Sequence, residues 1–187
     1  MSALVIILIV IGTIIALMLI AALFIGKEMN IEKTVTISRP LLQVFEYIKF
    51  VKNHDNFNVW AMMDPAIKKE YKGTNGQPGF VFAWDSSKKK NVEAGEQEIK
   101  RIDEGKSIEH ELRFIRPMHD VADAKFIFEP VSAGQTKLQW GFYSKMKFPM
   151  NVMKQAIRGM LDKNPETGLQ NLKTVRKNSA DIFTLSN

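Results

Sequence analysis

The chain has 187 residues, of which 45% are hydrophobic and 25% are charged, with a net charge of +6 and a pI near 9.4. Because it contains no cysteine, disulfides, thiolate zinc sites and a cysteine nucleophile are excluded. The three histidines, His54, His110 and His119, lack the close spacing of a histidine metal motif, so we expect neither a metal nor a cofactor. The excess of positive charge is typical either of a solvated basic surface or of contact with an anionic one.

The first segment of the chain is apolar. Over residues 4–25, sixteen of 22 side chains are Leu, Ile, Val or Phe. A helix of that length reaches about 33 Å, enough to cross a hydrocarbon core of about 30 Å. A cleaved signal peptide would instead have a basic residue before the run, a shorter apolar stretch and an A-x-A site after it, and the sequence has none of these. We therefore predict a single-pass membrane anchor over residues 1–26, with the lipid bilayer as a partner.

The charges that flank this segment predict its orientation. Only Met1 and Ser2 precede the apolar run, whereas Lys27, Lys33 and Arg39 follow it. Because lysine and arginine are enriched on the cytoplasmic side of membrane helices, we expect the rest of the chain to lie in the cytoplasm.

Residues 27–182 predict one α+β domain, followed by a short tail over 183–187. Alternating side chains over 30–37 predict a strand, and Ser38-Arg39-Pro40 marks the start of a helix over 41–50. A second short helix or turn is expected over 53–60. Six strands with intervening turn signals follow, over 67–72, 80–84, 92–102, 108–115, 122–131 and 136–143.

Two glycines predict irregular positions in this series of strands, and helices are expected after the last strand. Gly95 predicts a bulge, and the segment around Gly105 predicts a hairpin turn. Residues 151–160 have a helical pattern, and Asn164-Pro165-Glu166 is expected to start a last, long helix. The order predicts a curved sheet around that helix, which buries a core and can leave a cavity.

Catalytic motifs are absent from the sequence. There is no Gly-rich phosphate loop, no G-x-S-x-G elbow and no H-E-x-x-H motif. Asp64 and Glu70 are isolated carboxylates, interpreted as surface or turn residues. Lys88-Lys89-Lys90 is either a solvated hairpin tip or a contact with anionic lipid. No helix combines basic with base-reading residues, so nucleic acid is not an expected partner.

Aromatic and apolar side chains gather on one face of the predicted strands. Packing beneath the long helix would explain this face, and so would an apolar pocket for a hydrophobic ligand. His110 is expected to face inward, either as a satisfied core histidine or as a pocket group that hydrogen-bonds a ligand or acts as an acid or base. No catalytic residue is assigned. The candidate ligand-binding residues are Trp60, Phe82, Trp84, Gln97, His110, Phe114, Phe126 and Trp140.

A series of local patterns recurs in order over residues 31–177 and carries a family resemblance. They are Val44-Phe45-Glu46-Tyr47-Ile48; Phe57 and Trp60; Asp64-Pro65; 79–84 and Gly95; Leu112-Arg113-Phe114 and Pro117; Gly134, Thr136 and Trp140; and Gly168-Leu169-Gln170-Asn171-Leu172-Lys173. With them the chain resembles the SRPBCC superfamily, the START-related group that includes polyketide cyclase/dehydrase and lipid-transport-like proteins. Many relatives have Trp where Phe57 stands.

The resemblance implies a helix-grip fold, in which a curved antiparallel sheet surrounds a long C-terminal helix with a cavity between them. It implies binding of a hydrophobic or amphipathic small molecule, and it does not imply catalysis. We therefore predict a membrane-anchored module that binds a hydrophobic or lipid-like small molecule. Two alternatives remain open: a cyclase- or hydrolase-type enzyme that uses His110 and a pocket carboxylate in the same cavity, and a non-catalytic regulatory or partner-binding protein.

Overall fold

The computed structural model describes residues 2–59, 62, 64, 66–86, 94–116 and 119–175, with only the backbone of 160–166 and 173–175. Trp60, one of the predicted site residues, lies outside the described residues. The Lys88-Lys89-Lys90 run and the tail over 183–187 also lie outside them.

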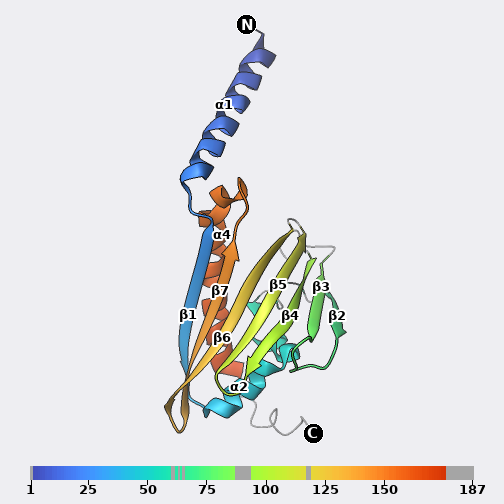
Figure 1. Ribbon diagram of the computed structural model, residues 1–187, viewed down its shortest axis with the longest axis vertical. Helices are drawn as coiled ribbons and strands as arrows, with labels where there is room; N and C mark the ends of the chain where they lie inside the picture. The colour runs from blue at the N-terminus through green and yellow to red at the C-terminus, as the bar shows by residue number, and fades with distance from the viewer. Residues whose placement is uncertain are drawn as a thin grey trace.

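Seven strands of the described chain form one antiparallel sheet. They are β1 (Glu28–Ile37), β2 (Lys68–Lys72), β3 (Val81–Asp85), β4 (Ala94–Asp103), β5 (Ser107–Arg116), β6 (Asp120–Ser132) and β7 (Gln135–Lys145). Their order across the sheet is β1-β7-β6-β5-β4-β3-β2, so β2 to β7 form a meander and β1 adds to its β7 edge (Figure 1). The predicted bulge is confirmed by a shift of register between Ala94 and Gly95, and Gly105 occupies the predicted hairpin turn with a φ of 69°.

The helices cover one face of this sheet on the β1 side and lie at its ends. They are α1 (Ala3–Phe24), α2 (Leu41–Lys49), the short 3-10 helices η1 (Val51–Asn56) and η2 (Met150–Met153), and α4 (Lys154–Val175). In Figure 1, α1 projects away from the domain, and α4 lies behind β1, β7 and β6. Leu169 and Leu172 of α4 are buried against the sheet. The predicted α+β, helix-grip architecture is therefore confirmed.

The last helix begins ten residues earlier than Asn164-Pro165-Glu166 predicted, because α4 starts at Lys154 and continues through Pro165. Ile157 packs against the same core as Leu169 and Leu172, and the spacing places all three within one third of the helix circumference. Proline inside a helix costs about 3 kcal/mol. Packing of Ile157 before Pro165, and of Leu169 and Leu172 after it, offsets that cost, and the local sequence signal did not reveal these contacts.

The core lies between the helices and the inner face of the sheet. Val44, Phe45 and Ile48 of α2 are fully buried, as their helical spacing predicted. The Phe45 ring meets the Phe128 ring of β6 edge-on, with 5.1 Å between the centroids. This contact ties α2 to the middle of the sheet.

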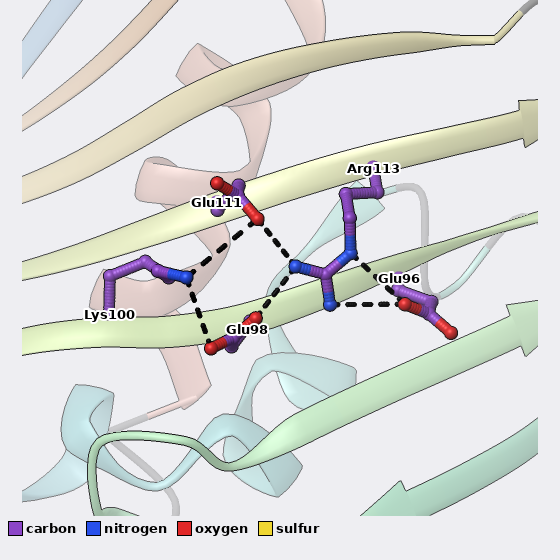
Figure 2. Close-up of polar contacts among 5 residues, drawn as sticks. All are labelled: Glu96, Glu98, Lys100, Glu111 and Arg113. Carbon is purple, nitrogen blue, oxygen red and sulfur yellow. Dashed lines mark hydrogen bonds and ion pairs between the residues drawn. The ribbon is translucent and has the colours of Figure 1, made fainter.

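The outer face of β4 and β5 carries a network of charges instead (Figure 2). The Arg113 guanidinium on β5 lies 3.0 Å from Glu96 and 2.6 Å from Glu98, both on β4, and it also contacts Glu111. Lys100 lies 3.2 Å from Glu98 and 3.9 Å from Glu111. The hydrogen bond from Arg113 is the largest cause that lowers the pKa of Glu98. Because successive strand residues point to opposite faces, these carboxylates lie away from the inner face.

One buried side chain joins α1 to the domain. Asn151 of η2 is fully buried and donates hydrogen bonds from Nδ2 to the carbonyls of Ala22, at 2.6 Å, and Ile25, at 2.7 Å. The Nζ of Lys154 lies 3.3 Å from the carbonyl of Gly26. The last carbonyls of a helix lack partners within the helix, so Asn151 satisfies them and fixes the direction in which α1 leaves the domain.

Substitution of this asparagine tests the junction. We expect Asn151→Ala to accelerate trypsin cleavage after Lys27, because it removes two hydrogen bonds of about 1 kcal/mol each. The measurement is limited proteolysis of the full chain in detergent micelles. Asn53→Ala is the matched control, since its Nδ2 bonds the carbonyl of Tyr47 at 2.9 Å, away from α1. Equal cleavage rates after Lys27 in the two variants would contradict this assignment.

Candidate ligand-binding site

The inner face of the sheet changes character across its strands. At the edge beside α4 the face is closed, and Ile31, Leu138 and Phe128 are each exposed by less than 5%. On β3 the inward-facing Phe82 and Trp84 are only half-buried. The part of the sheet away from α4 therefore presents apolar surface that the core does not fully cover.

Aromatic rings form a continuous series on this half-buried part. Ring centroids are 5.4 Å apart for Tyr71 and Phe82, 5.7 Å for Phe82 and Trp84, and 6.5 Å for Trp84 and Phe114. These residues come from β2, β3 and β5. Gln97 of β4 pairs with Phe82 in the strand register and is 8% exposed, so it places one amide within the aromatic series. We call Tyr71, Phe82, Trp84, Gln97 and Phe114 the aromatic surface.

Gly95 leaves the space that the indole of Trp84 occupies. A Cβ atom at Gly95 would lie 2.5 Å from Cζ2 of Trp84 and 2.8 Å from the carbonyl oxygen of Arg113. Only a residue without a side chain leaves room there, so the indole lies across the bulge at the start of β4.

A second group of rings surrounds two buried histidines. His110 of β5 is 1% exposed, and His54 of η1 is 5% exposed. Their ring centroids are 5.9 Å apart, and the Phe126 ring lies 5.8 Å from His110 and 5.7 Å from His54. The two imidazoles therefore contact each other within an aromatic environment, on the same inner face as the aromatic surface.

The two histidines differ in their hydrogen bonds. His54 Nε2 lies 2.8 Å from the carbonyl of Ile48. Because a carbonyl only accepts, Nε2 carries the hydrogen and donates it. Neither ring nitrogen of His110 has a hydrogen-bond partner within the described part of the chain. A buried polar group left without a partner costs about 1–3 kcal/mol, so His110 is suited to a polar group that a ligand would bring.

Burial also sets the charge of this pair. It lowers the pKa of His54 to about 4, against smaller opposing effects of the Ile48 hydrogen bond and the Asp55 charge. Burial, and secondly the charge on His54, lower the pKa of His110 to about 3. Both imidazoles are neutral near pH 7, so His110 offers one donor and one acceptor rather than a positive charge.

Most of the chain matches one known protein family. Residues 28–176 match the model of the family described as polyketide cyclase / dehydrase and lipid transport. The chain belongs to this polyketide cyclase family. The resemblance inferred from the sequence is thereby confirmed. No curated protein matches the chain in sequence.

Solved structures of similar fold support the architecture of this polyketide cyclase family member. A protein from Mesorhizobium loti has 12% identity and a TM-score of 0.59, with 81% of this chain and 98% of that one covered. A Thermobifida fusca protein has 13% identity and a TM-score of 0.55, with coverages of 77% and 90%. The di-domain ARO/CYC BexL of the BE-7585A biosynthetic pathway has 16% identity and a TM-score of 0.55, with coverages of 79% and 50%. At these identities the likeness shows the fold alone.

In this polyketide cyclase family member, the seven predicted site residues that the structure describes fall into three groups. Phe82, Trp84, Gln97 and Phe114 belong to the aromatic surface, and His110 and Phe126 belong to the histidine group. Trp140 lies in the closed part, 6.1 Å from Phe142 between ring centroids and opposite Phe126 in the register.

Sequence reasoning missed two residues of these groups, His54 and Tyr71. His54 stands in the polar run Asn53-His54-Asp55-Asn56, which has no apolar periodicity to indicate burial. Tyr71 lies in a strand whose burial pattern is mostly exposed. Alternation with Lys69 was the one signal that could have placed Tyr71 on the inner face.

The carboxylates do not supply an acid/base partner for His110. Within the described residues, His110 forms no hydrogen bond with any carboxylate. Asp64 was interpreted as a surface or turn residue, and the surface interpretation is wrong because Asp64 is 5% exposed. It accepts hydrogen bonds from Ser86 Oγ at 2.5 Å and from the backbone N–H of Ala66 at 3.0 Å, so it stabilises a turn. Among the described residues, no group of three or more His, Asp or Glu could hold a metal.

The histidine pair predicts a dependence of stability on pH. Between pH 6.5 and 4.5 the unfolded chain binds protons at His54 and His110, whereas the folded chain, with pKa values of about 4 and 3, does not. The free energy of unfolding therefore falls as the pH falls, by up to about 1.4 kcal/mol per pH unit for each histidine. Urea denaturation of the full chain in micelles measures this slope. His110→Leu should roughly halve it, and a slope unchanged by that substitution would contradict the burial of a neutral His110.

Proposed function

We propose that this protein is a membrane-anchored binding module for a hydrophobic or lipid-like small molecule. The observation that carries the proposal is His110, a buried and neutral imidazole without a hydrogen-bond partner in the described chain. It lies on the same face of β5 as Phe114, which belongs to the half-buried aromatic surface. A molecule with an apolar body and one hydroxyl or carbonyl group would match both features.

The family supports binding of an apolar ligand more directly than catalysis. Its description includes lipid transport as well as polyketide cyclase and dehydrase. A cyclase- or hydrolase-type mechanism would need a group that gives or takes a proton near neutral pH. Both pKa values in the histidine pair lie far below 7, and no described carboxylate bonds His110. These features favour a binding role over an enzymatic one.

The anchoring part of the proposal rests on α1. Its mean hydropathy is 3.3 over eighteen residues, and every residue of α1 except Ala22 is exposed. Insertion of the sixteen Leu, Ile, Val and Phe side chains over residues 4–25 contributes on the order of −5 to −10 kcal/mol on the scale for membrane helices. A signal sequence can also pass this test of length and hydropathy. The hydrogen bonds from buried Asn151 to the end of α1 favour a helix that stays with the domain.

The retention of α1 can be tested on the expressed protein. We expect the intact mass of the protein extracted from membranes to include residues 1–26. We also expect the protein to stay in the membrane fraction when the membranes are washed with alkaline carbonate. Ile11→Arg, near the helix centre, should shift protein to the soluble fraction because a charged residue there costs about 2.5–3.5 kcal/mol. Ile11→Leu is the matched control and should behave as wild type. A mature protein that lacks the segment would identify a signal sequence instead.

The proposed ligand site predicts that one substitution, His110→Leu, raises the stability of the ligand-free protein and lowers the retention of ligand. His110→Leu removes an unpaired buried polar group, so we expect it to raise the free energy of unfolding of the ligand-free protein by about 1–3 kcal/mol. The same change should reduce the amount of ligand that co-purifies, by roughly 2- to 10-fold, because the ligand loses a hydrogen bond. Thermal unfolding measures the first effect, and native mass spectrometry with lipid extraction of the full chain measures the second.

Thr136→Val is the matched control for that experiment. Thr136 is also fully buried, but its Oγ1 donates to the carbonyl of Arg39 at 2.8 Å. Its replacement should lower the free energy of unfolding by about 1 kcal/mol and leave ligand retention unchanged. A wild-type protein with no co-purifying molecule, and with no stabilisation by any lipid class, would contradict the proposed function.

A further inference from the structure

A basic groove lies where α1 meets the domain. Its volume is about 630 Å³, and its charged lining consists of Lys27, Glu28, Lys145, Lys154 and Arg158. With four positive side chains and one carboxylate, the lining residues have a formal charge of +3. It lies outside the aromatic surface and the histidine group, and none of its residues was predicted as a site.

Three segments distant in sequence assemble this groove. Lys27 and Glu28 follow α1, Lys145 ends β7 opposite Glu28 in the strand register, and Lys154 and Arg158 occupy successive turns of α4. Figure 1 shows that α1 leaves the domain at the end where β7 finishes and α4 begins. Among the described residues, neither Lys27 nor Lys145 forms a salt bridge with a carboxylate, and Glu28 is the one acidic side chain in the lining.

The junction holds the groove rigidly at the end of α1. The Lys154 ammonium bonds the carbonyl of Gly26 at 3.3 Å, and the backbone N–H of Met146 donates to the carbonyl of Lys27 at 2.9 Å. Asn151 fixes the last turn of α1 itself. The backbone segments that carry the positive side chains are therefore held in place relative to the end of α1, which lowers the cost of ordering them around a ligand.

The position of the groove just after the end of α1 indicates its depth relative to a bilayer. This step rests on the proposed function, in which α1 spans a bilayer. The helix ends at Phe24, and the groove begins with Gly26. Because headgroup regions add only about 5–8 Å to each side of a hydrocarbon core of about 30 Å, the groove would lie at the level of the lipid phosphates. Phe148 and Met153, at the same end, are exposed by 45% and 42%, as expected for side chains in contact with a bilayer surface.

We propose that the basic groove binds the phosphate of an anionic phospholipid in the leaflet from which α1 emerges. Lysine and arginine are the side chains that bind phosphate through charged hydrogen bonds. A lipid whose headgroup carries a compensating positive charge would gain less from a groove of net charge +3, so the site would select anionic over zwitterionic lipids. The bound lipid would hold the domain in one orientation at the membrane.

The test uses the full chain in nanodiscs that contain phosphatidylcholine and a minority of phosphatidylglycerol with the same acyl chains. Native mass spectrometry reports which lipids stay bound after release from the nanodisc. For wild type we expect phosphatidylglycerol to be enriched roughly fivefold or more over its share in the nanodisc. Lys154→Gln/Arg158→Gln should abolish the enrichment. Because Lys154 also bonds Gly26, Lys27→Gln/Lys145→Gln provides a second variant, with the same expectation.

Two controls separate this groove from general charge and from the ligand site. Arg101→Gln/Lys106→Gln also removes one arginine and one lysine, near the end of β4 and in the turn that follows it, and should keep the enrichment. That end of β4 lies far from α1 (Figure 1). His110→Leu should keep it as well, because His110 is not part of the groove. Enrichment lost in His110→Leu but kept in both groove variants would place the lipid elsewhere and overturn the inference.

The remaining outcomes are also decisive. A wild-type chain that inserts but retains both lipids in proportion overturns this inference alone, and one that does not insert overturns the membrane-spanning proposal with it. In nanodiscs of phosphatidylcholine only, we expect millimolar inorganic phosphate to give no thermal stabilisation. Stabilisation equal to that given by phosphatidylglycerol would identify a site for free phosphate and overturn the lipid assignment.

Discussion

A sheet of seven strands is much wider than the helix that packs on it. With about 4.8 Å between neighbouring strands, its outer strands are roughly 29 Å apart, whereas a helix with its side chains is about 10 Å wide. One long helix therefore covers only part of the inner face. Here α4 packs at the β1 edge, where Leu169 and Leu172 are buried, and the inward-facing aromatic residues of β3 and β5 remain half-buried. The aromatic surface is a consequence of this mismatch in width.

A small residue fixes the place of α4. A Cβ atom at Gly168 would lie 3.1 Å from the carbonyl oxygen of Phe57, so α4 and the chain after η1 approach more closely than a side chain would easily allow. Phe57 in turn lies 5.2 Å from His54 between ring centroids. The helix that closes the core thus adjoins the residues around the histidine pair, and movement of one would disturb the other.

Buried polar groups in the same core show why His110 stands apart. Thr136 donates to the carbonyl of Arg39, and His54 donates to the carbonyl of Ile48. Thr136 and His54 are therefore both paired, and His54 is so even though its ring contacts His110. His110 lies on the same face of β5 as the half-buried Phe114, and it has no such partner in the described chain. A group that costs stability in the empty protein and would gain a hydrogen bond in the complex is typical of a binding site rather than of a core.

The sequence predicted the strands and the inward position of His110 because the period of two in a strand is local. It could not predict that α4 continues through Pro165, since the contacts that stabilise the helix there are made with residues distant in sequence. His54 was missed for a similar reason, because a 3-10 helix of polar residues gives no sign of which side chain is buried. The basic groove depends on Lys27 and Lys154, which are adjacent only after β1 and β7 have paired. Local periodicity therefore predicts which side chains share one face of a helix or strand. Which of these faces contact each other depends on contacts between residues distant in sequence.

A single helix links the two proposed sites. Lys154 at the start of α4 lines the basic groove, and Leu169 and Leu172, near its end, close the core beside the histidine pair. Its 22 residues span about 33 Å, so the inner face of the sheet stays within a few tens of ångströms of the end of α1. If α1 spans a bilayer as proposed, this short distance would keep the inner face of the sheet at a high effective concentration of membrane lipids. A weak site is sufficient under that condition, which agrees with one polar group and a half-buried aromatic surface rather than a closed and fully paired pocket.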